Sequence, residues 1–241
     1  AYPGVALPKA VRRYDAVELA ARRPLANRWA FSVSYLWSRL HGNFSGLSQS
    51  DENGRVSPNV GRLYDYPAMM FDESGKPVYG RLATDRPHQL KAFVVYSTTF
   101  GLNVSAFQFV GSGLPVTREV AVLPPSNYPM QYIGRMSEGR TPTLSQTDLY
   151  IQQDIAMVRG TRLSAGIGVS NLFNRGVVVS KFVVESEVGS GLTFTQADLY
   201  AGLLDFQQLF VQQKLLTDPR FLMANGYQPP RSARVMIKWT F

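Results

Sequence analysis

The 241-residue chain contains no cysteine, which excludes disulfide frameworks, zinc knuckles and thiol nucleophiles. Charged residues are also scarce, at 17% of the chain against about 25% in an average soluble domain. A highly charged disordered tail is therefore excluded. The chain has no apolar run of the roughly 18 residues that a membrane helix needs. Its longest uncharged segment, 92–117, is rich in Val, Phe and hydroxylated residues and favours strands.

The charges that are present are mostly basic, with 25 Lys and Arg against 17 Asp and Glu and a net charge of +8. They do not cluster with aromatic residues as a nucleic-acid site requires, so no nucleic-acid partner is expected. We expect them near short turns, at inward-facing positions or within strands: Arg13, Arg22, Arg23, Arg28, Arg159, Arg162, Lys91, Arg234 and Lys238. Two interpretations stay open. In the first, the cations line the lumen of a β-barrel or anchor the chain to anionic phosphate groups. In the second, they reflect the ordinary solvation of turns and of a polar lumen.

Large apolar and small or polar residues alternate with a period of two, which is the pattern of β-strands. The clearest case is 29–38, where Trp, Phe, Val, Tyr and Trp alternate mainly with Ala and Ser. Seven segments show the pattern: 17–22, 29–38, 90–100, 102–110, 148–157, 162–170 and 232–241. The faces of 90–100 and 102–110 cannot be assigned from it. All 15 prolines are expected outside the seven strands, because proline cannot donate to a ladder.

The connections between these segments alternate in length. Short ones lie at 24–28, near Gly101 and at 158–161, and long ones at 40–87, 112–146 and 171–230. In an antiparallel meander all short turns then share one end of the sheet, which is typical of outer-membrane barrels. Loops this long are uncommon in compact soluble domains.

Aromatic residues support the same interpretation. Trp29 and Trp37 share a face eight residues apart, which is about 19 Å along the membrane normal of a tilted strand. We expect them in two aromatic girdles, with Trp239 and Phe241 completing the girdle at the short-turn end. A soluble all-β sandwich, whose aromatic face would be core, is the alternative. Seven strands cannot close a bacterial barrel, so the remaining strands are expected N-terminal to this chain.

Four stretches carry a family resemblance. The first is Val169–Asn174, whose motif positions are Asn171, Leu172, Phe173 and Asn174, and the second is Asp85–His88, whose motif positions are Asp85, Arg86, Pro87 and His88. The third is Gly111–Thr117, with motif positions Ser112, Gly113 and Pro115, and the fourth is the closing strand Pro230–Phe241. In this order they resemble motifs of TonB-dependent outer-membrane receptors, including the Oar-like branch. Val116 departs from the pattern, because the family has an aromatic residue there.

The resemblance implies an all-β fold: an antiparallel up-and-down transmembrane β-barrel segment. Residues 1–241 would be the C-terminal part of the barrel domain, about seven strands of a 22-stranded barrel with long extracellular loops, and the plug domain would lie outside this chain. It implies a Gram-negative outer-membrane receptor for energised uptake of a scarce ligand. Implied partners are outer-membrane lipid and lipopolysaccharide, the remaining strands and plug, a periplasmic energy-coupling protein and an unknown ligand. The alternatives are a passive porin or adhesion-type barrel, or a soluble all-β binding module.

The sequence offers little catalytic chemistry. His41 and His88 have no neighbouring ligand at metal-binding spacing. Gly166 and Gly168 begin a dinucleotide-like pattern without its third glycine, and we expect them to face a crowded lumen instead. No enzymatic activity, metal or cofactor is expected.

The long loops contain two further features. Thr195 resembles an N-cap, and Leu199, Leu203, Phe206 and Phe210 recur at helical spacing, which predicts one helix extending to about Leu216. Its apolar stripe either packs on neighbouring loops or touches ligand. In the first long loop, Tyr64, Tyr66 and Tyr79 are possible ligand contacts.

Overall fold

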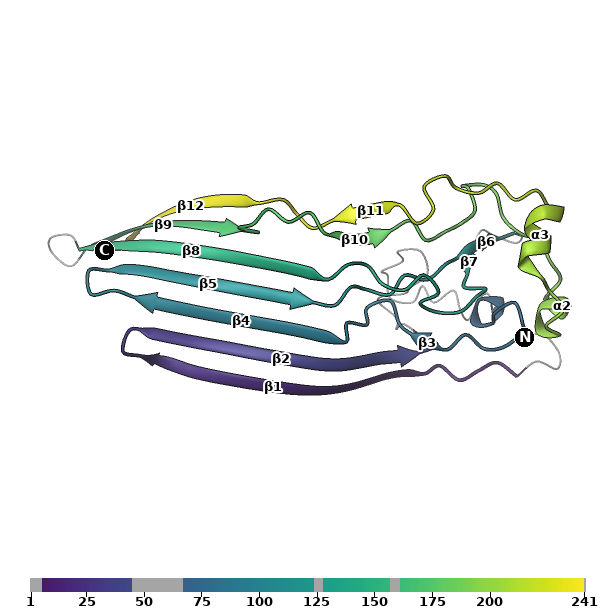
Figure 1. The fold of residues 1–241 in the computed structure, drawn as a ribbon, viewed down its shortest axis with the longest axis horizontal. Coiled ribbons are helices and arrows are strands. Elements are labelled where there is room, and N and C mark those ends of the chain that lie inside the picture. The colour runs from purple at the N-terminus through teal and green to yellow at the C-terminus, as the bar shows by residue number, and fades with distance from the viewer. Residues whose placement is uncertain (1–5, 45–66, 124–127, 157–160, 241) are drawn as a thin grey trace.

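The computed structural model describes residues 6–44, 67–123, 128–156 and 161–240. Its main feature is one antiparallel sheet in which each long strand pairs with the next one along the chain (Figure 1). In order, the strands are β1 (Arg12–Ala26), β2 (Trp29–Gly42), β4 (His88–Ser97), β5 (Leu102–Gly111), β8 (Leu144–Ala156), β9 (Arg162–Ser170) and β12 (Ser232–Thr240). The short β3 (Gly80–Arg81) adds to the end of β2. The prediction of seven antiparallel strands in an all-β meander is confirmed.

The two ends of the sheet differ as the connection lengths predict. Figure 1 shows the tight connections of β1–β2 and β4–β5 at one end, hereafter the turn end, and the long connections at the other, the loop end. Asn27 and Arg28 both have positive φ, 52° and 72°. A two-residue turn with both φ values positive matches the right-handed twist of the flanking strands, so it allows a tight hairpin.

Pro24 corrects one expectation, because it lies inside β1. The register between β1 and β2 shifts between Arg23 and Ala26. A bulge of this kind leaves a residue unpaired, and proline is tolerated there because it has no N–H to donate.

The pairing register places the predicted apolar positions of the five strands other than β4 and β5 on one face, which we call the apolar face. One row runs across six strands as Phe31, Val94, Ala106, Leu149, Val169 and Ala233. This row also assigns the faces of β4 and β5, which their weaker alternation leaves open. The large side chains of this face are exposed, for example Leu19 at 66% and Ile237 at 74%.

The opposite, polar face carries a hydrogen-bonded network. Tyr150 Oη donates to Gln152 Oε1 at 2.9 Å, Gln152 donates to Asp154 at 2.7 Å, and Ser164 Oγ donates to the same carboxylate at 2.7 Å. A Cβ at Gly166 would lie 2.8 Å from Tyr150 Oη. Gly166 therefore faces a crowded polar surface, and the expectation that this surface lines a lumen stays a prediction.

The three long connections fold together beyond the loop end, and we call them the loop layer (Figure 1). Its elements are η1 (Pro67–Met70), β6 (Val120–Val122), β7 (Tyr128–Met130), β10 (Val178–Lys181), α2 (Gln196–Tyr200), α3 (Phe206–Gln212) and β11 (Ala224–Tyr227). The three long connections share one core, which consists of Ala68, Met69, Met70, Phe71, Val120, Val122, Met130, Tyr132, Leu192, Leu199 and Phe206. Among the described residues, no helix has the length and apolar character to span a membrane.

The single helix predicted after Thr195 is wrong, because α2 and α3 are separate. Thr195 does cap α2, since its Oγ1 accepts from the Asp198 amide at 3.2 Å. The chain then turns at Gly202, whose φ is +66° and whose Cβ would meet Ser74 O at 2.6 Å. Asp205 caps the new helix by accepting from the Gln208 amide at 3.0 Å, which favours a fresh start over continuation. Leu203 in the break is 74% exposed, so the stripe packs only in part.

Candidate functional site at the rim between sheet and loop layer

Asp85 is the centre of the junction between β2 and the loop layer. Its side chain is fully buried, and its carboxylate accepts from the Leu40 amide at 2.6 Å and from Arg140 Nη2 at 2.5 Å. Arg81 Nη1 lies 3.3 Å from the same carboxylate. Arg140 also donates to the carbonyls of Asp85 and Gly113, at 2.9 and 3.0 Å. One buried charge thus joins the first and second long loops to the sheet.

The Asp-Arg-Pro-His and Ser-Gly-x-Pro stretches meet at this junction. Arg86 Nη1 donates to Ser112 O at 2.5 Å, and the Ser112 amide donates to His88 O at 2.9 Å. Pro87 O accepts from the Ser38 amide at 2.9 Å. These contacts hold the start of β4 between β2 and the end of β5.

Gly113 has a steric reason to be glycine. A Cβ at this position would lie 1.5 Å from Thr141 O, because the second long loop passes directly over it. Pro115 forms an isolated bridge with Arg140 in the same crossing. The two stretches therefore shape the rim and position Arg140.

The Asn171 stretch forms a second junction, between β8, β9 and β12. The Asn171 amide donates to Asp148 Oδ1 at 2.8 Å, and its side-chain Nδ2 donates to Pro229 O at 2.8 Å. Leu172 donates its amide to Thr147 O at 2.8 Å, and Asn174 Oδ1 accepts from the Arg231 amide at 2.9 Å. Both asparagines have φ near +50°, a conformation that asparagine tolerates. Phe173 is 68% exposed.

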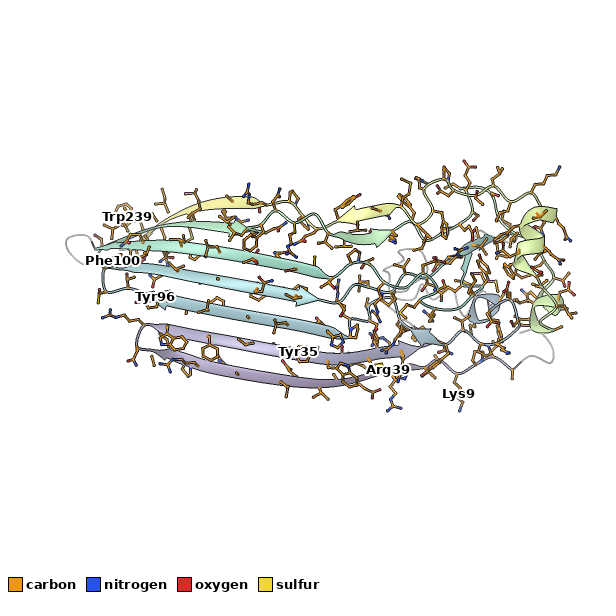
Figure 2. All side chains as sticks on the ribbon, in the orientation of Figure 1. Lys9, Tyr35, Arg39, Tyr96, Phe100 and Trp239 are labelled. Atoms are coloured by element: carbon orange, nitrogen blue, oxygen red, sulfur yellow. The ribbon has the colours of Figure 1, made fainter. Side chains whose placement is uncertain are left out.

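The predicted girdle residues lie on the apolar face at opposite ends. Trp29 pairs with Tyr96 near the turn end and carries the Arg23 guanidinium 4.4 Å above its ring. Trp239 lies at the same end, paired with Leu163 and 66% exposed. Trp37 lies toward the loop end. Figure 2 shows Tyr96 and Trp239 toward the turn end of the sheet and Tyr35 near the middle of β2. Phe241 lies outside the described residues.

Of the three predicted loop contacts, Tyr64 and Tyr66 lie outside the described residues. Tyr79 is 52% exposed and packs edge-on against His41, with ring centroids 5.7 Å apart. His41 lies at the end of β2, as expected, and His88 accepts from or donates to Tyr35 Oη across 2.7 Å. The described residues contain no group of three or more His, Asp or Glu side chains that could hold a metal ion.

One predicted location is wrong. Arg13 was expected near a short turn or facing inward, but it pairs with His41 at the loop end, on the apolar face. The error arises because β1 begins at Arg12, five residues before its clear alternation starts. The side chains of Arg159 and Arg162 are not among those described.

The loop layer contains a polar cluster that sequence patterns did not reveal. Arg118 Nε donates to Glu138 at 2.8 Å, and Tyr132 Oη donates to Glu185 at 2.8 Å. Burial raises the pKa of Tyr132, so its hydroxyl stays a donor at physiological pH. No local sequence signal marks these residues or Arg140, because their partners lie far away in the sequence. Arg140 and Asp85, for example, are 55 residues apart.

The polar face is hollowed near its centre. The hollow has a volume of about 590 Å³ and is lined by Phe93, Phe107, Asp148, Tyr150, Arg234 and Met236, among others. Aromatic walls with one carboxylate and one guanidinium could seat a polypeptide segment or an organic ligand.

Comparison with known proteins identifies a relative. The chain is 28% identical to the TonB-dependent transporter Oar of Myxococcus xanthus over an alignment of 251 positions, which covers 97% of this chain. The chain is similar to a TonB-dependent transporter. The predicted resemblance to such receptors, Oar-like ones included, is thereby confirmed. The chain spans 23% of the length of Oar. No family model matches the chain, and no solved structure matches it.

Proposed function

We propose that this chain forms the C-terminal part of the barrel of an outer-membrane receptor that takes up a scarce ligand with energy supplied from the periplasm. The observation that carries the proposal is the similarity to a TonB-dependent transporter along nearly the whole chain. The activity lies in the complete receptor, and we assign no enzymatic step to this segment.

The apolar face supports the membrane part of the proposal. Its exposed Leu, Val, Ile and Trp side chains would be costly in water but favourable against hydrocarbon. Two glutamines of this face bond locally: Gln153 donates to Phe100 O at 2.8 Å, and Gln108 donates to Ser145 Oγ at 3.1 Å. Thr147 donates to Gln108 Oε1. Such local pairing of polar side chains suits a bilayer.

The sheet edges support the incomplete-barrel part. In the described residues β1 pairs only with β2, and β12 pairs only with β9. A lipid environment requires both edges to be paired, so further strands of the parent protein would close the barrel.

Site-directed labelling tests the membrane placement. Because the chain has no cysteine, single cysteines at Ile237, on the apolar face, and Met236, on the polar face, can carry a spin label in the full-length parent. We expect collisions with oxygen to dominate at position 237 and not at position 236. Equal, water-like accessibility at both positions would contradict the proposal and favour a soluble all-β module.

Energy coupling needs a separate experiment. The full-length parent, purified in detergent, should bind the periplasmic domain of its organism's energy-coupling protein in a pull-down. A parent that inserts in the membrane but binds no such domain would be a passive porin or adhesion-type barrel.

A further inference from the structure

The loop end of the β1–β2 hairpin carries a group of cations on the apolar face. Arg39 follows Trp37 by two residues, so it points to the same face, one pleat closer to the loops. Arg13 lies opposite His41, one step further along this face. Both side chains are exposed, Arg13 to 68%. Lys9 is exposed just before β1, and Figure 2 shows Lys9 and Arg39 at the loop end of this hairpin. We call Lys9, Arg13 and Arg39 the basic patch.

The charge of the basic patch is only partly balanced. Asp15 lies opposite Arg39 in the register and pairs with Arg13 at 3.1 Å, with its side chain 44% exposed. Within the described part of the chain, Arg39 has no ion pair of its own. Three cations therefore face one carboxylate, and the net positive charge is directed outward.

Aromatic residues lie immediately below the basic patch. Trp37 pairs with His88, and the Tyr35 ring stacks on His88 at an interplanar angle of 22°. Tyr35 Oη and His88 Nδ1 are 2.7 Å apart. Below these residues the face is aliphatic, as at Val33. From the sheet centre outward the order is aliphatic, aromatic and cationic, which matches hydrocarbon, interface and headgroup phosphates of a bilayer.

The aromatic residues at the turn end are arranged differently. There the nearest cation, Arg23, lies over the Trp29 ring at 4.4 Å and donates to Ala26 O at 3.4 Å. Its charge is already engaged with the protein. Arg28 is also exposed at the turn end, but it lies in the hairpin turn itself, whereas Arg13 and Arg39 lie at paired strand positions of the apolar face.

We propose that the basic patch, with the aromatic row beneath it, binds the phosphate groups of an anionic lipid in the leaflet at the loop end. The inference rests on the proposed function in so far as the apolar face must lie in a bilayer. Arginine suits this role because its guanidinium binds phosphate in a bidentate manner. The aromatic row would hold the glycerol or sugar region below the phosphates.

The test compares two charge-matched double variants of the full-length parent in detergent. Arg13→Gln with Arg39→Gln removes the proposed site. Arg12→Gln with Arg22→Gln removes the same charge from the opposite face of β1, and Arg12 lies at the same height as Arg13. Native mass spectrometry measures binding of a diphosphorylated glycolipid, of its dephosphorylated form and of phosphatidylcholine.

We expect the wild type and the Arg12/Arg22 variant to bind the diphosphorylated glycolipid alike and the other two lipids weakly. Each arginine at a membrane surface contributes about fivefold to anionic lipid affinity, so the Arg13/Arg39 variant should bind about 30-fold more weakly. Equal binding by both variants would overturn the proposal. Displacement of the glycolipid by millimolar inorganic phosphate would also overturn it, by indicating a site for free phosphate.

The spin-label experiment keeps this result separate from the proposed function. A parent with lipid-like accessibility at position 237 but no difference between the variants refutes only the phosphate site. A parent with water-like accessibility there refutes the membrane placement itself.

Discussion

The buried charge of Asp85 allows a quantitative prediction for the junction between sheet and loop layer. Asp85→Asn keeps the side-chain shape and an acceptor for the Leu40 amide, but it removes the negative charge that Arg140 approaches at 2.5 Å. Breaking a buried ion pair costs about 3–5 kcal/mol. In the variant, Arg140 keeps two carbonyl acceptors, and its side chain is 23% exposed to water. Because its charge is then not left wholly uncompensated, we expect the lower end of this range, about 3 kcal/mol.

Amide hydrogen exchange on the full-length parent measures this loss. A change of about 3 kcal/mol in the free energy of local opening corresponds to a roughly hundredfold loss of protection. We expect it at the amides of Leu40 and Thr141, on the two sides of the junction. Asp15→Asn is the matched control, because it breaks an exposed pair worth less than about 1 kcal/mol.

The reasoning would be refuted if Leu40 lost less than about fivefold protection in Asp85→Asn, or if Asp15→Asn had the same effect. A double-mutant cycle with Arg140→Gln adds a second check. If Asp85 and Arg140 act as a pair, the double variant should cost clearly less than the sum of the two single variants.

Three further predictions address sterics, pH and the membrane-facing surface. Gly113→Ala should cost at least about 3 kcal/mol of stability because its Cβ would meet Thr141 O, whereas Gly176→Ala, with no atom nearby, should leave the urea unfolding midpoint unchanged. Burial raises the pKa of Glu73, so the folded state binds the proton of this side chain more tightly than the unfolded state does, and the stability of the protein falls as pH rises above about 4.5. In denaturant titrations, Glu73→Gln should therefore stabilise the protein at pH 7 and have no effect at pH 3. Ile151→Arg should reduce the folded barrel by about 2–4 kcal/mol in lipid refolding, while Gln152→Arg on the opposite face should cost much less; similar costs would refute the face assignment.

The strands were predictable because their signal is local. A period of two is visible within about ten residues, and pairing only propagates the face from Phe31 to Ala233 across the sheet. Pro24 and Arg13 were misplaced because both lie where β1 extends beyond its clear alternation. Strand ends are set by pairing with the neighbour, and one strand's own sequence does not contain that information.

The loop layer was much less predictable, since its contacts join distant segments. The core brings Met69 of the first loop to Met130 of the second and Phe206 of the third. Tyr132 and Phe206 stack with ring centroids 4.9 Å apart. The Thr195 cap was correctly predicted from a four-residue pattern, but the break at Gly202 depends on a contact with Ser74, more than a hundred residues earlier.

The shared core of the loop layer constrains how the protein can be engineered. Replacing one loop with that of another receptor would leave the apolar side chains of the other two loops facing a surface of the wrong shape. Such single-loop chimaeras should misfold at the rim even when the transplanted loop carries the desired ligand contacts. Transplanting all three loops together, cut at the strand ends next to Asp85 and Asn171, would preserve the core and the two junctions as one unit.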